Sequence, residues 1–275
     1  GNRAVLHDRF NLDKWREYIA TYQPKVAGLP PAGVQMVLDA DVPKAELEGL
    51  MAIGSGAAPL DVTVQRKFEE HYGIPILISY GATEFGGPVT ATNLKDIEAF
   101  GNTKLGSVGR PIGGAQLRII DAETKDELPA GHEGLLEVIS PRIGPDWIRT
   151  SDLAMIDEDG FLYHRGRADG AIMRGGFKVL PETIERALLL HPAISAVGVV
   201  GVKDRRLGQV PGAVIQFKPG VPKPGPDELE AHLREHVLST HIPVHWRFVD
   251  ELPKTLSFKI DRPAVTAMFS DVAAI

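Results

Sequence analysis

The 275-residue sequence contains no cysteine. Disulfide bonds, thiolate catalysis and cysteine-based metal sites are therefore excluded. Nine histidines are present, and we interpret none of them as a zinc ligand. No apolar run approaches the ~20 residues that a membrane-spanning helix needs, and residues 1–10 lack the apolar stretch of a signal peptide. We therefore expect no membrane span and a cytoplasmic location.

The sequence also has no excess of positively charged residues. Lysine and arginine number 30 against 36 aspartates and glutamates, so the formal net charge is −6. Because nucleic-acid binding requires a basic face, we expect no nucleic-acid partner. What is present is a hydrophobic share of 43% and a charged share of 24%, which are typical of a folded chain. The length is sufficient for two domains.

The dinucleotide-binding fingerprint Gly-x-Gly-x-x-Gly is missing as well. Gly54 and Gly56 have its first spacing, but Pro59 stands where the third glycine would lie. A dehydrogenase that binds NAD is therefore a poor interpretation. The segment is still a loop of small residues, which lets a flat ring lie against the backbone. A plain strand-to-helix turn is the alternative.

Apolar periodicity predicts the first elements of structure. Residues 12–22 have the spacing of an amphipathic helix. A strand within residues 49–60 leads into a helix over residues 60–73, and residues 74–80 form a buried strand that Gly81 breaks. Strand, helix and strand in about 30 residues make a βαβ unit, which implies a parallel sheet.

The middle of the chain changes character. Within residues 105–165, short strands alternate with Gly, Pro and Asp turns, which predicts a small antiparallel or barrel-like β unit. A second α/β pattern follows, with a helix that has Pro181 near its start and ends before Pro192. Asp227 and Glu230 have the spacing of a capping box, which predicts a later helix.

Two polar segments suit nucleotide chemistry. In "SYGATE", residues 79–84, a strand ends and the hydroxyl of Thr83 precedes the carboxylate of Glu84, which suits phosphate contact and Mg²⁺ ligation. In "RTSDLAMID", residues 149–157, Asp152 lies in a polar turn between β segments and could accept both hydroxyls of a ribose. The alternatives are a solvated turn for the first segment and an Asx-turn for the second.

A third segment combines charges with paired glycines. It is "GRADGAIMRGGFKVLPETIE", residues 166–185. Arg167 and Asp169 lie where the β unit gives way to the second α/β pattern, at a predicted domain boundary. Gly175 and Gly176 permit unusual backbone angles and the close approach of a ligand. The alternative is an interdomain linker followed by a β-turn.

The fourth segment, "LPKTLSFKIDR", places a lysine near the end of the chain. Lys259 follows the bulky Phe258 within residues 252–262. A compact charge on a flexible stem suits a transferring phosphoryl group or a developing charge between carboxylate and phosphate. A lysine whose stem lies along the surface and whose charge remains in water is the alternative.

The order of these four segments resembles that of the adenylate-forming superfamily, which includes acyl-CoA synthetases, adenylation domains of peptide synthetases, and luciferases. The resemblance implies an α/β fold. Residues 1–168 would be the later part of a large domain, with a βαβ portion at about 1–95 and a β-barrel-like unit at about 96–168. Residues 169–275 would be a small, mobile C-terminal α+β domain.

The resemblance also implies a role for each matching residue. For the nucleotide, the resemblance implies that the adenine is lined by Ser55, Gly56, Ala57 and Pro59, that Tyr80 and Gly81 flank adenine and acyl group, and that Asp152 binds the ribose hydroxyls with support from Arg167. For the phosphates and the metal, Thr83 would contact phosphate, Glu84 would hold Mg²⁺, and Lys259 would serve adenylation. In the C-terminal domain, Asp169 would be the hinge, and Gly175 and Gly176 would shape the tunnel for the CoA pantetheine.

The implied activity is that of an acyl-CoA ligase. A carboxylic acid and ATP would give an acyl-adenylate and pyrophosphate, and CoA would then give acyl-CoA and AMP. Transfer to CoA is favoured because "MRGGFKVLPETIE" looks most like acyl- and aryl-CoA ligases. The alternatives are a ligase specialised for thioesterification of a preformed adenylate and a non-catalytic fragment that complements a separate N-terminal piece. A homodimer is an open alternative for the assembly.

Two departures from the superfamily pattern lead to further expectations. No Thr-Ser-Gly-Thr-Thr-Gly phosphate loop is present, so we expect a truncated chain without the N-terminal half, unable to perform adenylation alone. Phe258 replaces the usual glycine before the lysine, and its bulk restricts the backbone, so we expect impaired adenylation. Ser151, where glycine is commoner, is interpreted as a minor change.

Overall fold

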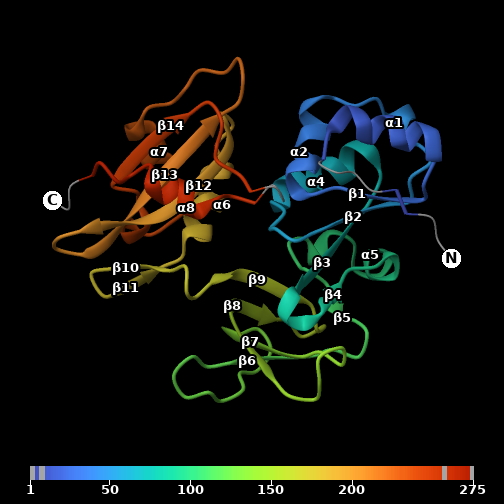
Figure 1. The fold of residues 1–275 in the computed structure, drawn as a ribbon, viewed down its shortest axis with the longest axis horizontal. Coiled ribbons are helices and arrows are strands. Elements are labelled where there is room, and N and C mark those ends of the chain that lie inside the picture. The colour runs from blue at the N-terminus through green and yellow to red at the C-terminus, as the bar shows by residue number, and fades with distance from the viewer. Residues whose placement is uncertain (1–3, 6–9, 256–258, 273–275) are drawn as a thin grey trace. The chain divides into compact units, whose positions relative to one another are not determined.

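Figure 1 shows the chain as a computed structural model, which describes residues 4–5, 10–255 and 259–272. The chain divides into two compact units. The first unit comprises the residues up to 150 together with 154–164, and the second comprises 151–153 together with the residues from 165 onward. The predicted domain boundaries at 168 and 169 stay a prediction. No helix in the described ranges is long and apolar enough to cross a membrane.

The first unit contains a five-stranded sheet. Its strands, in spatial order, are β1 (Val26–Gly28), β2 (Ala52–Gly56), β3 (Ile76–Ala82), β4 (Gly87–Ala91) and β5 (Arg110–Pro111). The first three strands are parallel, and β4 and β5 are antiparallel to their neighbours. Around them lie α1 (Leu12–Tyr22), α2 (Pro31–Asp39), α3 (Lys44–Leu47), α4 (Val62–Tyr72) and α5 (Leu94–Phe100), with the 3₁₀ turns η1 (Thr83–Phe85) and η2 (Gly101–Lys104).

Local sequence signals explain the predicted helices of this unit. Asn11 caps α1 by accepting the Lys14 amide at 3.0 Å, and the helix over residues 12–22 is confirmed. Asp61 caps α4 through the amides of two following residues, and Gly73 ends the helix with a φ of 70°. The predicted βαβ unit is confirmed, because β2 and β3 flank α4 and pair in parallel.

Helices α1, α2 and α4 bury one core against this sheet. Trp15, Ile19, Val37 and Phe68 belong to the same apolar cluster as Ile53 of β2. The prediction that Gly81 breaks β3 is wrong, because the strand runs on to Ala82. Its register against β4 shifts between Tyr80 and Gly81, because β4 has an extra residue, Val89, opposite this point, so a bulge in β4 lies here rather than an end of β3.

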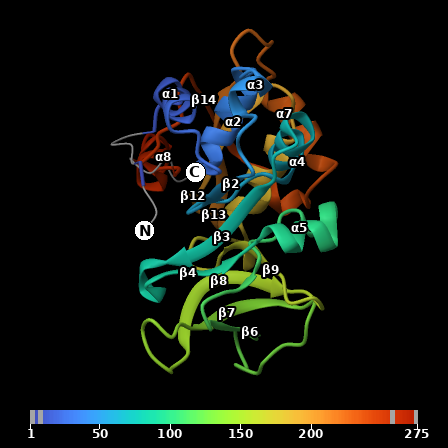
Figure 2. The same ribbon diagram turned by 90° about the vertical axis from the view of Figure 1, so that its right-hand side faces the viewer.

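A second sheet has four strands in the order β6 (Gln116–Ile120), β7 (Glu133–Ile139), β8 (Ile148–Ile156) and β9 (Leu162–Arg167). Figure 2 shows these strands side by side. The sheet is open rather than a closed barrel. Asp152 lies inside β8, so its prediction as part of a turn is wrong. No glycine or proline interrupts β8, and the strand therefore continues through the polar residues 150–152.

The second unit is built on another antiparallel-rich sheet, β11 (Phe177–Val179), β10 (Ile172–Arg174), β13 (Gly208–Phe217) and β12 (Ile194–Asp204), with β14 (His245–Val249) parallel to β13. Its helical elements are α6 (Pro181–Leu189), α7 (Pro226–Arg234), α8 (Arg262–Ala267) and the 3₁₀ turn η3 (Ser239–His241). The predicted helix at Pro181 is confirmed. The predicted capping box is wrong, because Gly225 caps α7 and Pro226 is its first residue. The predicted mixed α/β fold class is confirmed.

Candidate functional site

The carboxyl ends of β2 and β3 bring two predicted segments together in the first unit. Ser55 pairs with Ile78, and Gly56 pairs with Ser79, in the parallel register of these strands. The "GSGAAPL" and "SYGATE" segments therefore leave the same edge of the sheet. In open parallel sheets this edge is where ligands bind.

Two glycines at this edge are required by the backbone itself. A Cβ atom on Gly56 would lie 2.8 Å from the Ser79 carbonyl oxygen, and one on Gly81 would lie 2.5 Å from the carbonyl oxygen of Gly87. Ala57 has a φ of 65°, in the left-handed region that residues with a side chain seldom adopt. Such strain clusters at functional sites. The sequence predicted these residues as ligand contacts, and the structure adds a packing reason for both glycines.

The two segments that leave this edge contain both buried and exposed polar groups. The Ser55 hydroxyl is buried and has no hydrogen-bond partner among the described residues. Thr83 and Glu84 are exposed on η1, which the buried Phe85 anchors. A buried hydroxyl without a partner is a group that a bound ligand can complete. Pro59 lies between Ser55 and Thr83 in sequence and is exposed.

The ring of Tyr80 has an aromatic neighbour that the sequence reasoning missed. The imidazole of His164 on β9 lies 5.8 Å from the Tyr80 ring, centroid to centroid, and Phe85 lies at 6.1 Å. Spacing along the chain gave no signal for this contact, because His164 belongs to the other sheet of the unit. A flat ligand ring beside Tyr80 would meet both aromatic side chains.

In the second unit, Arg167 joins residues for which separate roles were predicted. It donates from Nη2 to the Ser151 hydroxyl at 2.7 Å, and from Nε and Nη2 to the Asp169 carboxylate at 2.9 Å and 2.6 Å. The Arg167 guanidinium lowers the pKa of Asp169. The Ala168 amide also donates to the Ser151 carbonyl. The interpretation of Ser151 as a minor change missed its hydroxyl contact, and Asp152 is the next residue of β8.

Gly175 and Gly176 form the turn between β10 and β11. Their φ values of 57° and 87° match the two-residue hairpin turn that needs positive φ at both positions. The Gly175 amide donates to the Leu207 carbonyl at 2.8 Å, and a Cβ atom on Gly175 would lie 3.0 Å from the Leu207 side chain. The predicted unusual backbone angles are confirmed, and the tunnel role stays a prediction.

Lys259 lies on one arm of a narrow loop in the second unit. Lys254 and Ile260 form an antiparallel bridge, and the Thr255 amide donates to the Lys259 carbonyl at 2.8 Å. The Lys259 amide donates to the Thr255 hydroxyl at 3.2 Å. The residue is exposed. Phe258, on which the expectation of impaired adenylation depends, lies outside the described residues.

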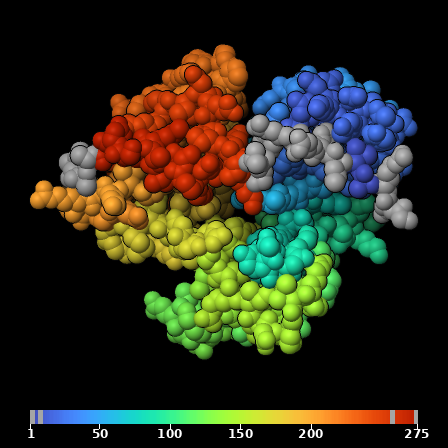
Figure 3. All heavy atoms as spheres, in the orientation of Figure 1, coloured from blue at the N-terminus to red at the C-terminus, as the bar shows by residue number. Residues whose placement is uncertain are grey.

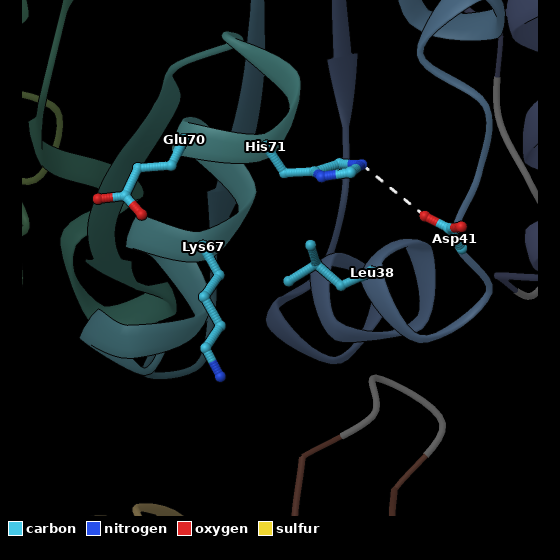
Figure 4. A pocket seen from close by; sticks show the side chains of 5 residues that line it. All are labelled: Leu38, Asp41, Lys67, Glu70 and His71. Atoms are coloured by element: carbon cyan, nitrogen blue, oxygen red, sulfur yellow. Dashed lines mark ion pairs between the residues drawn. The ribbon is translucent and has the colours of Figure 1, made fainter.

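A surface hollow and a pair of histidines contain none of the predicted site residues. A surface hollow of about 390 Å³ in the first unit is lined by Leu38, Asp41, Lys67, Glu70 and His71, and Figure 4 shows His71 turned toward Asp41, 3.8 Å away. No predicted site residue lines it. Its lining side chains carry charges of both signs, so it does not favour an anionic ligand.

The sequence reasoning also passed over a His-x-x-Glu-His run at His232 and His236, a spacing found in some zinc enzymes. The two rings lie 4.7 Å apart, and His232 Nε2 is bonded to the Ala187 carbonyl. Within the described ranges, no group of three His, Cys, Asp or Glu side chains could hold a metal ion. Within the run, His232 joins α7 to α6 through its contact with the Ala187 carbonyl.

The arrangement of sheets described above is also found in solved structures of one enzyme family. The crystal structure of ATP-bound MatB from Rhodopseudomonas palustris superposes with a TM-score of 0.84 and 25% identity, over 96% of this chain and 54% of that chain. A sequence model of the AMP-binding enzyme family matches residues 1–145, and that of its C-terminal domain matches residues 183–259. The chain belongs to the AMP-binding enzyme family, which confirms the predicted superfamily.

Curated relatives are similar to this chain over nearly all of its length. A 2-succinylbenzoate–CoA ligase of Bacillus pumilus is 28% identical over 95% of this chain and 54% of the relative. A long-chain-fatty-acid–CoA ligase of Bacillus subtilis is 30% identical over 95% of this chain and 49% of the relative. The chain spans about half the length of the curated relatives it matches.

Proposed function

We propose that this chain is the nucleotide-binding and C-terminal portion of an AMP-forming acyl-CoA ligase. The observation that carries the proposal is the shared edge of β2 and β3, which both the small-residue loop and the Thr83–Glu84 turn follow. The family match and the relatives' names, which are those of CoA ligases acting on different acids, support it. The acid is therefore proposed only as a carboxylic acid.

The residues of this edge fit an adenine ring. Ala57 and its neighbours give a flat ring access to the backbone, and the unpartnered Ser55 hydroxyl can bond a ring nitrogen. Asp152, with Arg167 beside it through Ser151, is proposed to bind the ribose hydroxyls. Asp169 is proposed as the hinge, because it is bonded to Arg167 where the chain enters the second unit.

The residues also fit one Mg²⁺ ion. Mg²⁺ is bound through one or two carboxylates plus phosphate and water, rather than by an all-protein cage. Glu84 is an exposed carboxylate, and no cluster of three metal-binding side chains exists in the part of the chain that the structure describes. Glu84 would hold the ion, which would offset the negative charge of the phosphates, while the Thr83 hydroxyl contacts a phosphate oxygen.

Two displacements make up the proposed reaction. A carboxylate oxygen of the acid attacks the α-phosphorus of ATP, and the bond from that phosphorus to pyrophosphate breaks. The sulfur of CoA then attacks the acyl carbon, the bond to AMP breaks, and the thiol proton passes to solvent. Lys259 stabilises the charge of the first step. The turn of Gly175 and Gly176 admits the pantetheine in the second step.

The test uses the complete protein that carries this chain. A panel of carboxylic acids is incubated with ATP and CoA, and the products are analysed by mass spectrometry. We expect an acyl-CoA and AMP for at least one acid, with loss of AMP formation in Lys259→Ala. Formation of ADP, or no acyl product with any acid, would overturn the proposal.

Location and assembly complete the proposal. We propose the cytoplasm as the location, because ATP and CoA are available there, and a homodimer as an alternative to a monomer. Cell fractionation tests the first statement. Sedimentation of the purified complete protein tests the second.

A further inference from the structure

Both stems of the loop that carries Lys259 are anchored to the second unit. At the first stem, the Leu252 amide donates to Gln216 Oε1 at 2.9 Å, and Leu252 is buried. The second stem is tied to the first, because the Asp261 amide donates to the Pro253 carbonyl at 3.0 Å. The loop is therefore held at its base, while Lys259 itself remains exposed.

Arg262 makes the strongest of these anchors. It opens α8, just beyond Lys259 in the chain. Its Nη1 donates to the Val199 carbonyl at 2.7 Å and to Glu185 Oε1 at 3.1 Å. Its Nη2 donates to Glu182 Oε1 at 3.1 Å and to Glu185 Oε2 at 3.2 Å. One guanidinium thus joins the start of α8 to α6 and to β12.

The partner carboxylate is buried and depends on this arginine. Burial raises the pKa of Glu185, whose charged form the Arg262 guanidinium favours. Glu185 Oε1 also accepts the Val199 amide at 2.9 Å. Since β12 is the last strand of its sheet, both outward main-chain groups of Val199 are bonded by side chains rather than by another strand. The three residues form a single connected assembly.

A glycine lets the same segment lie close against β12. A Cβ atom on Gly198 would lie 3.2 Å from Ile260 Cγ2 and 3.3 Å from Val265 Cγ2. The neighbours of Arg262 on either side therefore pack directly on the strand backbone. In Figure 3 the C-terminal part of the second unit, coloured red, forms part of its surface. The Glu185 side chain that holds Arg262 is only 11% exposed, whereas Lys259 is open to solvent.

We propose that Arg262, held by Glu185 and Glu182, is a positioning residue that fixes the backbone from which Lys259 serves adenylation. The proposal rests on the function proposed above for Lys259. A lysine has a flexible stem, so its charge reaches a defined place only if its main chain is fixed. Displacement of a catalytic group by ~1 Å can cost roughly 10²-fold in rate. Arginine suits the task because its planar fork bonds several acceptors at once.

The first experiment separates the two half-reactions in the complete protein. Arg262→Gln, Arg262→Lys and the control Arg247→Gln are compared with the unaltered enzyme. Arg247 is another arginine of the second unit with a two-bond partner, Asp271, but it lies on β14. Adenylation is measured as ATP–pyrophosphate exchange with the acid found in the panel. Thioesterification is measured as acyl-CoA formation after CoA is added to the chemically prepared acyl-adenylate.

We expect Arg262→Gln to lower kcat of the exchange roughly 10²-fold, with KM values and thioesterification within about twofold of the unaltered enzyme. Arg262→Lys, which keeps the charge, should recover part of the loss, and Arg247→Gln should change neither step. The proposal would be overturned if, in Arg262→Gln and also in Arg262→Lys, the rates of adenylation and thioesterification fell by the same factor. Arg262 would then only hold the unit together. Unchanged exchange would overturn the proposal as well.

A second measurement needs no activity and uses the 275-residue chain. Hydrogen–deuterium exchange is recorded for the amides of residues 252–262 in the same variants. Arg262→Gln should raise exchange there by about tenfold or more, without a matching rise in α7. If no acid gives exchange of pyrophosphate in the unaltered enzyme, the proposed function fails, and this measurement still decides on the anchor. Unchanged amide exchange in Arg262→Gln would overturn the anchor itself.

Discussion

At the scale of single residues, Gly81 shows how a site residue can be required by packing before any ligand is considered. The backbone of Gly87 and Pro88 lies where a Cβ atom of residue 81 would stand, at 2.5 Å. Backbone atoms cannot move aside as a flexible side chain can. The close approach of β3 to the bulge in β4, just before the turn that holds Glu84, therefore depends on this glycine.

We expect Gly81→Ala to lower the free energy of unfolding by about 1–3 kcal/mol, the usual effect of overpacking. Urea unfolding of the 275-residue chain measures the change. Gly28→Ala, in β1 of the same sheet, is the matched control because a Cβ atom at that position would have no neighbouring atom within 4 Å. Equal unfolding free energies for the two variants would contradict the packing argument.

Residue types indicate candidate roles but not contacts. They single out Asp152, Arg167 and Asp169 in the sequence. Their types did not reveal that Arg167 bonds both Ser151 and Asp169. Arg167 and Ser151 are 16 positions apart in the chain, so no local pattern encodes their contact. The same holds for His164 beside Tyr80.

At the scale of elements, the Arg167–Asp169 pair lies on an exposed segment. The two side chains are 57% and 54% exposed. Exposed pairs contribute about 0.2–1 kcal/mol, because water screens them. We expect a double-mutant cycle with Arg167→Ala and Asp169→Ala to give a coupling energy in that range, smaller at high salt. A coupling above about 2 kcal/mol, measured by urea unfolding, would contradict this exposed geometry.

Helices α6 and α7 pack through histidines, which makes their stability depend on pH. Burial lowers the pKa of His191, and nearby His232 adds to the effect, as does Lys218 more weakly, while Glu228 acts in the opposite direction. The neutral ring accepts the Ala193 amide at Nδ1. A histidine whose folded pKa is lowered contributes stability above its unfolded pKa of about 6.5, and this stability is lost as pH falls below it.

We therefore expect the urea midpoint of unfolding to decrease as the pH is lowered from 7.5 to 5.5. The decrease should be smaller in His191→Asn than in the unaltered chain. His132→Asn is the control, since His132 is exposed in the first unit. The same pH slope in His191→Asn and in the unaltered chain would contradict the assignment to His191.

Capping and periodicity explain which elements were predictable. The helices α1, α4 and α6 have a cap, a proline or a terminal glycine beside an apolar stripe, so the sequence defines both their type and their ends. Strand β8 carries polar residues at its centre, and that pattern alone predicts a turn. Pairing with its neighbours keeps those residues extended, which is a tertiary effect that a local pattern lacks.

At the scale of the whole molecule, the chain holds only some of the groups that the proposed reaction needs. It spans about half the length of its relatives and contains no Thr-Ser-Gly-Thr-Thr-Gly phosphate loop. We expect the purified 275-residue chain to release no pyrophosphate from ATP with any acid of the panel, yet to bind adenosine nucleotides weakly. Steady pyrophosphate release would refute this expectation, and calorimetric titration tests the binding.

The overall architecture was predictable because the motifs occur in a fixed order along the chain. Their order indicated the superfamily, and the fold class followed. The extent of each compact unit did not follow, because residues 151–153 of β8 group with the second unit although their neighbours in sequence do not. Only contacts distant in sequence define such a division.

The bonded edge of β12 has a consequence for solubility. An uncovered edge strand offers free N–H and C=O groups, and it can add a strand from another molecule. Arg262 and Glu185 occupy those groups at Val199. We expect Arg262→Gln to self-associate at high concentration, which light scattering would detect, whereas Arg247→Gln should remain dispersed. A side chain that steadies a catalytic loop would thereby also keep neighbouring molecules from joining their sheets.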